Sequence, residues 1–150
     1  MKAVLQRVLS AKVTVADKTV GETGKGLVVL LGVAKGDGKE EAALLASKTA
    51  QMRIFPNEQG KMSLSLKDIG GQALVVPNFT LCADCRHGRR PDFIGAARPE
   101  PALELFRTFA ELLGREGVAK VGTGRFGADM KLEIVCDGPV TIVLDTDLLR

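Results

Sequence analysis

Residues 26–33, GLVVLLGV, decide the fold of this chain. The five residues at 27–31 are all apolar and do not alternate with polar side chains. A short unbroken apolar run of this kind predicts a strand that is buried on both faces. The run ALVV at residues 73–76 follows a turn at residues 69–71 and predicts a second buried strand.

A helix is predicted after the first buried strand. It follows a turn at residues 36–38, with Asp37 as the candidate N-cap. Glu40 and Glu41 suit the positive end of a helix dipole. The residues that share its core-facing side are Ala42, Leu45, Ala46 and Met52.

The second helix is defined by Pro101 in its first turn and by Gly114 at its end. Its apolar residues recur at i, i+3, i+4, i+7, i+10 and i+11, which is helical spacing. The stripe predicts a core-facing surface rather than a cofactor-binding one. It comprises Ala102, Leu105, Phe106, Phe109, Leu112 and Leu113.

Further strands are predicted at both ends of the chain. Val13 and Val15 face the core before a turn near Asp17 and Lys18, and residues 131–135 alternate with Leu132 and Ile134 inward. The run at residues 140–144 is mostly apolar. Two helices among seven or eight strands predict an α/β fold of mixed β-sheets packed in layers, with both helices on one side. We expect a single domain over residues 1–150.

Composition narrows the function. The chain of 150 residues is 45% hydrophobic and 26% charged, and its formal net charge is +3. This charge permits nucleic-acid binding without requiring it, and six Phe with no Tyr or Trp leave few residues for a base-stacking platform. Three cysteines, an odd number, and an N-terminus without an apolar signal segment predict a cytoplasmic protein with reduced thiols. No apolar run is long enough to span a bilayer.

Familiar catalytic sets are missing or incomplete. A candidate zinc or redox set consists of Cys82, Cys85, His87 and Cys136. As a zinc site it lacks a second closely spaced pair of ligands. As a thioredoxin-like motif it lacks the position at the start of a helix. We therefore expect no metal and no cofactor. His87 is the only histidine, and there is no nucleophile elbow, phosphate loop or dinucleotide fingerprint. An enzyme built from this chain relies on backbone donors, hydroxyl groups and the substrate itself.

Three segments look functional. Residues 77–81, PNFTL, directly follow a buried strand and can present Asn78, Thr80 and free N–H groups to a pocket. Residues 136–141, CDGPVT, lie between two predicted strands, where the alternative is a plain hairpin turn. Residues 86–90, RHGRR, form a positive patch that either pairs with phosphates or is a solvated loop.

Taken together, these segments resemble the D-aminoacyl-tRNA deacylase family. The family's two signature segments usually have Ser-Gln-x-Thr and Asn-x-Gly-Pro-x-Thr. This chain has Pro77 for Ser, Asn78 for Gln and Cys136 for Asn, and it keeps both Thr residues and the Gly-Pro pair. The likeness runs end to end, in order and at the family's spacing, through residues 4–8, 26–33, 53–55, 60–62, 78–84, 88–91, 124–130 and 137–141.

The resemblance implies a homodimeric hydrolase that cleaves the ester between a D-amino acid, or glycine, and the 3′ end of tRNA, while rejecting L-aminoacyl-tRNA. It implies that the N–H groups near Phe79 and Thr80, beside Asn78, form an oxyanion hole. It also implies that Phe126 and Met130 line the pocket for the terminal adenosine.

The resemblance further implies that Gly138 and Pro139 are joined by a cis peptide, enter the partner's site and are oriented by Arg7. Charge and position make Arg86, Arg89 and Arg90 candidates for contact with tRNA phosphates. Two alternatives stay open, a relative with altered specificity and a non-catalytic tRNA-binding module.

Overall fold

The computed structural model describes all 150 residues and contains a six-stranded mixed sheet. The strands run in the order β2-β1-β3-β6-β7, and β8 pairs with the other side of β1. The β3–β6 and β6–β7 pairs are parallel and the remaining pairs are antiparallel. The strands are β1 (Lys2–Val15), β2 (Lys18–Thr23), β3 (Gly26–Gly32), β6 (Gln72–Pro77), β7 (Lys120–Thr123) and β8 (Lys131–Asp145).

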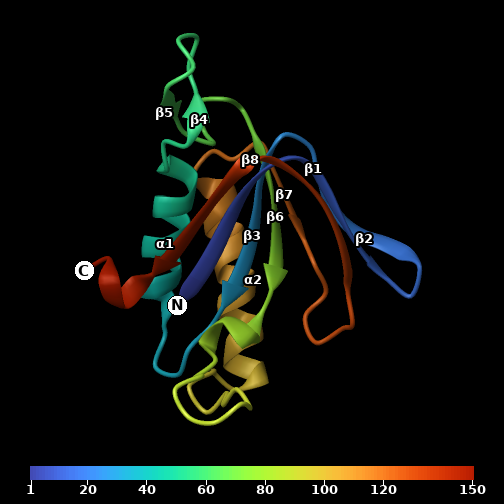
Figure 1. The fold of residues 1–150 in the computed structure, drawn as a ribbon, viewed down its shortest axis with the longest axis vertical. Coiled ribbons are helices and arrows are strands. Elements are labelled where there is room, and N and C mark those ends of the chain that lie inside the picture. Colours follow the sequence, from blue (N-terminus) through green and yellow to red (C-terminus); the bar gives the residue numbers. More distant parts are fainter.

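Two α-helices and several short elements complete the chain. The helices are α1 (Lys39–Gln51) and α2 (Pro99–Arg115). A small hairpin of β4 (Phe55–Pro56) and β5 (Met62–Leu64) projects beyond the end of α1 (Figure 1). Two 3-10 helices, η1 (Phe79–Cys82) and η2 (Thr146–Leu148), follow β6 and β8. No helix is both long enough and apolar enough to cross a membrane.

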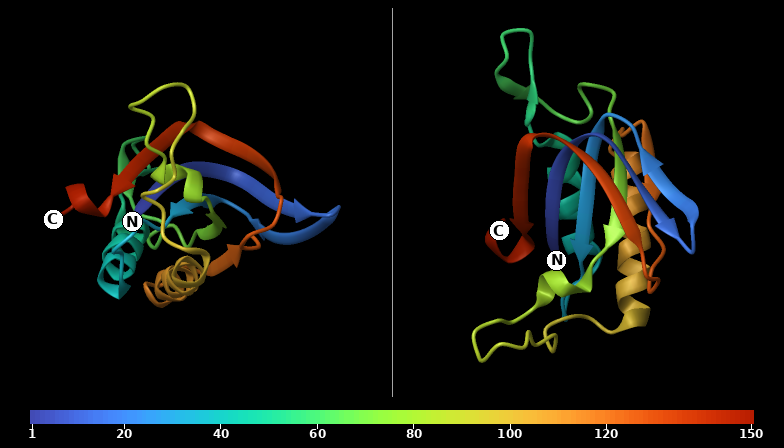
Figure 2. Two further views of the ribbon diagram at one scale, coloured as in Figure 1. Left: turned by 90° about the horizontal axis from the view of Figure 1, so that it is seen from below. Right: turned by 45° about the vertical axis from the view of Figure 1, so that its right-hand side comes forward.

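The two predicted buried strands, β3 and β6, are adjacent in the middle of the sheet. Alternate residues of each strand contribute to two separate cores, so both faces are covered. Both helices cover one face, as Figure 2 shows, and enclose the larger core of 23 buried residues. The prediction of mixed sheets with two helices on one side is confirmed.

The opposite face of the sheet is covered by the sheet itself. The strand β1 is strongly curved, and its second half carries β2 and the first half of β8 over the strands β3 and β6 (Figure 2). A smaller core of six buried residues fills the space beneath this curl. It comprises Val8, Ala11, Val13, Val28, Leu74 and Val76.

The start of α1 differs from the prediction. Gly38, and not Asp37, is the N-cap, and the Glu41 carboxylate accepts a hydrogen bond from the Gly38 N–H at 2.7 Å. The Asp37 carboxylate instead accepts from the Ala34 N–H at 2.7 Å and pairs with the α-ammonium group of Met1 at 2.8 Å. The buried ammonium needs this counter-charge, so Asp37 is not free to cap the helix.

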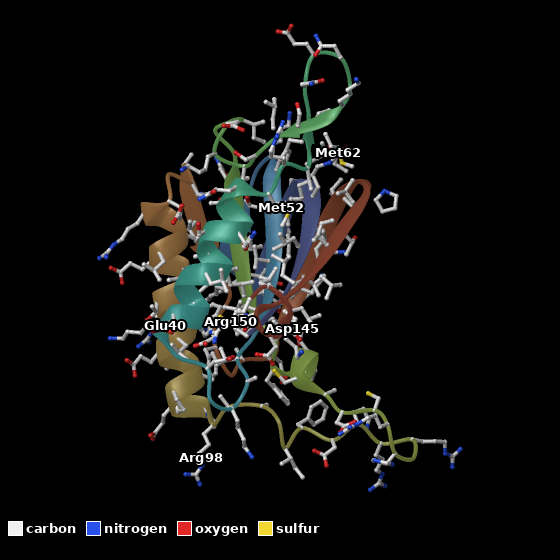
Figure 3. All side chains as sticks on the ribbon, turned by 90° about the vertical axis from the view of Figure 1, so that its left-hand side faces the viewer. Glu40, Met52, Met62, Arg98, Asp145 and Arg150 are labelled. Carbon is white, nitrogen blue, oxygen red and sulfur yellow. The ribbon has the colours of Figure 1, made fainter.

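The helix ends also differ from the prediction. Met52 is the C-cap of α1 and so lies just beyond the helix, although it still packs against the larger core. Gly114 does not end α2, because the helix continues to Arg115 and the left-handed turn falls at Gly117, with φ of 100°. Figure 3 shows α1 lying across the sheet, with Glu40 near its start and Met52 at its end.

Candidate active site

A hairpin turn at residues 136–141, the alternative interpretation of this segment, does not form. The strand β8 runs unbroken from Lys131 to Asp145, so the two strands predicted here are one. In its pairing with β1, Thr141 lies opposite Gln6 and Cys136 lies opposite Val8. One residue of β1, Arg7, therefore faces a bulge of four residues, 137–140, of β8.

The bulge contains the Gly-Pro pair. The Gly138–Pro139 peptide bond is cis, as the resemblance implies. Gly138 has φ of 147°, and a Cβ atom built there lies 2.4 Å from the backbone nitrogen of Val140, so only glycine fits. Both residues are exposed on the surface.

Arg7 holds the bulge at its base. The Nε group donates to the backbone carbonyl of Asp137 at 3.1 Å and lies 3.3 Å from that residue's carboxylate. The Nη1 group donates to the carbonyl of Ile54 at 2.7 Å. The side chain of Arg7 is only 11% exposed, so its planar fork ties the bulge to the segment before β4.

The other candidate residues line one pocket of about 600 Å³. Asn78, Phe79 and Thr80 form one wall, and Phe126 and Met130 belong to another part of the lining. The lining is mostly apolar with a few polar groups, which is the usual character of a site for a small organic group. Residues 137–140 are not part of this lining in the same chain.

The wall that contains Asn78 begins where β6 ends. The Asn78 N–H donates to the Leu31 carbonyl at 2.8 Å, which fixes the chain to the end of β3. The hydroxyl of Thr80 donates to the Asn78 side-chain oxygen. The first bond of η1 runs from the Leu81 N–H to the Asn78 carbonyl at 3.3 Å. The N–H groups of Phe79 and Thr80 precede it and have no acceptor within the helix.

Several lining residues were not singled out from the sequence. Phe93 meets Phe79 edge to face, with ring centroids 5.1 Å apart, and Ala96, Ala97 and Asp129 also line the pocket. Asp129 lies within a segment that carries the family resemblance, so a signal was present. Phe93 lies in an irregular segment, where no periodicity marks a residue that packs against a distant turn.

The basic loop between η1 and α2 contains Arg86, Arg89 and Arg90, and all three are exposed. Arg86 is bound within the loop, because its Nε and Nη2 groups donate to the Asp84 carboxylate at 2.9 Å and 2.6 Å. These hydrogen bonds lower the pKa of Asp84 to about 2. Arg89 and Arg90 belong to none of the chain's ion pairs.

The cysteines differ in their surroundings. Cys82 is buried, whereas Cys85 and Cys136 are exposed. Burial, the largest cause, raises the pKa of the Cys82 thiol above its usual value. Cys82 is therefore a neutral thiol at physiological pH and a poor nucleophile.

Comparison with known proteins identifies the family. The family model described as D-Tyr-tRNA(Tyr) deacylase matches residues 4–145, and this chain belongs to that family. A D-aminoacyl-tRNA deacylase of Roseiflexus sp. (strain RS-1) is 57% identical over 150 residues, which are 100% of this chain and 96% of that protein.

Two solved structures share the fold. One is described as "c-Myc DNA Unwinding Element Binding Protein"; it is 38% identical, has a TM-score of 0.92, and the match covers 97% of this chain and 98% of that one. The other is described as "Structural Analysis of a probable eukaryotic D-amino acid tRNA deacylase". It is 17% identical with a TM-score of 0.82, and the match covers 95% of this chain and 97% of that one.

Proposed function

We propose that this chain is an enzyme that hydrolyses the ester of D-aminoacyl-tRNA. One observation carries the proposal: five residues that the family resemblance marks as functional, from two distant segments, line a single pocket. Those residues are Asn78, Phe79, Thr80, Phe126 and Met130. The family membership of the whole chain supports the same activity.

The reaction consumes one water molecule. The water oxygen adds to the ester carbonyl, the bond to the ribose 3′-oxygen breaks, and the proton passes to that oxygen. The products are a free D-amino acid and tRNA with a free 3′ end. The ester is activated and the neighbouring ribose 2′-hydroxyl is held close by binding, so positioning replaces a histidine base.

The N–H groups of Phe79 and Thr80 are our candidates for the oxyanion hole. They lie at the pocket wall and lack an acceptor within η1, so they are available to the carbonyl oxygen as it gains charge. One such donor contributes roughly 2.7–4 kcal/mol to the stability of the transition state. The Thr80–Asn78 side-chain hydrogen bond holds the two residues in one arrangement. Thr80 is thus a positioning group in this mechanism and forms no acyl-enzyme.

The terminal adenosine is assigned to the part of the pocket beside Phe126 and Met130. Phe126 is half-buried against Phe106 of α2, with ring centroids 6.2 Å apart, so its position is fixed by the core. An aromatic ring and a polarisable thioether suit the flat face of a nucleobase.

We infer that the working unit is a homodimer. Gly138 and Pro139 are exposed and lie outside the pocket lining of their own chain, so reaching a substrate requires a second copy. The strand β8 has one edge that pairs with no strand of this chain. Three large apolar side chains on β1 and β8 are exposed, namely Leu9 (53%), Val135 (51%) and Val143 (74%). A second copy of the chain would cover them.

In this dimer the partner subunit's Gly138 and Pro139 form the wall that excludes an L-side chain. A wall rejects what is too large and not what is too small, so glycine is rejected only weakly. The enzyme accordingly removes glycine from a mischarged, non-cognate tRNA as well as D-amino acids. We propose that the enzyme is a single domain that works in the cytoplasm and acts on the 3′ acceptor end of tRNA. Arg89 and Arg90 of the basic loop then lie beside the tRNA phosphates. Arg86 contributes less, because Asp84 already neutralises it.

The activity is tested with D-Tyr-tRNA, Gly-tRNA and L-Tyr-tRNA as substrates. We expect fast release of D-Tyr, slower release of Gly and no release of L-Tyr above the rate without enzyme. Equal rates on D-Tyr and L-Tyr would make the chain a relative with altered specificity. Tight tRNA binding without turnover of any ester would make it a non-catalytic module.

The dimer is tested by Val143→Glu, with Ala43→Glu as the control. Both residues are exposed, but Ala43 lies on α1, which covers the opposite face of the sheet (Figure 2). We expect Val143→Glu to sediment as a folded monomer with no turnover, and Ala43→Glu to behave as wild type. An active monomeric Val143→Glu variant would refute the composite site.

A further inference from the structure

A second cavity, of about 450 Å³, adjoins the candidate active-site pocket. We name it the arginine cavity, after Arg107 of α2 and Arg125 of the loop that follows β7. Its apolar lining comprises Val20, Leu103, Phe106, Ala110 and Phe126. Nothing in the proposed reaction uses it.

The two cavities share part of their lining. Phe106 and Phe126 line both of them. The loop after β7 contributes Arg125 to the arginine cavity and then Gly127 to the pocket. A Cβ atom built on Gly124, in the arginine cavity, lies 2.9 Å from the sulfur of Met130, in the pocket. The arginine cavity and the pocket therefore adjoin each other on the two sides of Phe126.

The position along α2 gives the scale of this separation. The residues of α2 that line the pocket are Pro99, Ala102 and Phe106, and those that line the arginine cavity are Leu103, Phe106, Arg107 and Ala110. The two sets are offset by about one helical turn, which is about 5.4 Å. A stacked nucleic-acid strand rises about 3.4 Å per nucleotide. The offset is thus on the scale of one or two nucleotides.

The charge of the cavity is uncompensated. Arg107 and Arg125 are both exposed, and neither belongs to an ion pair of the chain. Guanidinium groups match phosphate oxygens in geometry as well as in charge. Two such groups above an apolar floor are the combination with which proteins hold single-stranded nucleic acid, where the cations follow the backbone and the floor receives a base.

We propose that the arginine cavity binds the nucleotides that immediately precede the 3′-terminal one of the aminoacyl-tRNA, through phosphate contacts from Arg107 and Arg125. The inference rests on the proposed function for the position of the terminal nucleotide. The basic loop lies before the N-terminus of α2, whereas the arginine cavity lies further along the helix. The single-stranded end therefore leaves the pocket along α2, and the basic loop contacts another part of the tRNA.

The test is the double variant Arg107→Gln with Arg125→Gln, measured in binding and in turnover. Binding uses a short 3′-terminal RNA without an amino acid, at salt concentrations from 50 to 200 mM. Two lost phosphate contacts reduce the slope of log affinity against log salt by about 1.4, at roughly 0.7 per contact. Over this range wild-type affinity therefore falls about sevenfold more than that of the variant. Arginine-to-lysine replacement at both positions should restore the slope.

Turnover compares D-aminoacyl-tRNA with D-aminoacyl-adenosine, which lacks the preceding phosphates. We expect the ratio of the two kcat/KM values to fall in the double variant. Arg115→Gln is the control, because Arg115 lies on the same helix, is paired with Glu111 and does not line the cavity. An unchanged salt slope in the double variant, or an equal loss in turnover of both substrates, overturns the inference. Because the binding assay needs no catalysis, a wild-type protein without turnover would refute the proposed function and leave the binding result to decide this inference.

Discussion

Replacing Gly32 by Ala should slow catalysis as well as destabilise the fold. Gly32 is the last residue of β3 and packs closely against the wall that contains Asn78 and Thr80. A Cβ atom built at Gly32 lies 3.0 Å from the backbone oxygen of Asn78, 3.0 Å from the Cβ of Leu81 and 3.3 Å from the sulfur of Cys82. Two of these three neighbours are backbone or Cβ atoms, which move only if η1 moves with them.

The size of the effect follows from these distances. Ordinary van der Waals contact begins at 3.4 Å, so the first turn of η1 must shift by about 0.4 Å. Overpacking of this kind costs about 1–3 kcal/mol of stability. A misplacement of 1 Å at a catalytic group costs on the order of 100-fold in rate. If the logarithm of the rate falls in proportion to the shift, 0.4 Å corresponds to a loss of roughly sixfold in kcat.

The assay is single-turnover deacylation of D-Tyr-tRNA, with thermal unfolding measured on the same samples. Gly24→Ala is the matched control, because its nearest neighbour would be the flexible side-chain oxygen of Gln72 at 3.4 Å. We expect Gly24→Ala to keep wild-type kcat. A Gly32→Ala variant with lowered stability and unchanged kcat would show that the geometry of η1 does not limit the reaction.

Three further outcomes are expected. Gly114→Ala should raise the free energy of unfolding by about 1 kcal/mol, measured with denaturant, because Ala is the better helix former. Gly114 is helical, and the nearest atom to an added Cβ lies 4.0 Å away. A loss of stability would contradict the helical assignment. Arg7→Lys removes the guanidinium fork and should cost roughly 2 kcal/mol of stability together with most of the turnover of D-Tyr-tRNA; wild-type turnover in a folded Arg7→Lys protein would rule out its positioning role. By NMR the Asp84 carboxyl should titrate near pH 2 and, in Arg86→Gln, closer to the ordinary 3.8. Because the pKa of Asp84 is lowered in the folded state, the ion pair with Arg86 contributes its full stabilisation of the fold above about pH 4 and loses it as the pH falls through about 2. An Asp84 midpoint that the Arg86 substitution does not move would exclude the pair in solution.

Some features were accessible without the structure because their signals are local. The unbroken apolar run at residues 27–31 marks a strand with both faces covered, and β3 is that strand. The apolar stripe of α2 repeats at helical spacing, and all of its residues except the half-buried Leu112 are buried. The candidate residues of the pocket were identified through the family resemblance, since composition and periodicity do not distinguish Phe126 from any other core aromatic.

Other features depend on partners that are distant in the chain. The sequence indicated an N-cap at Asp37 because a local rule favours it. Only the tertiary structure brings the Met1 ammonium, 36 residues away, to that carboxylate. Likewise, a local turn rule left a hairpin at Asp-Gly-Pro as an open alternative. In the structure β8 continues because Arg7, 130 residues away, bonds the bulge and β1 pairs on both sides of it.

The sequence by itself therefore determined the two main helices, the two buried strands and the family, and through the family five of the residues that line the pocket, because each follows from short-range periodicity or from the chain's own order of motifs. Only the tertiary structure decided which of those residues meet. It separated Gly138 and Pro139 from the pocket of their own chain, paired Arg86 with Asp84, and placed Arg107 and Arg125 around one cavity. The physical reason is that side-chain contacts depend on the packing of elements against one another, and a one-dimensional pattern contains no distance between residues that fold together from separate segments.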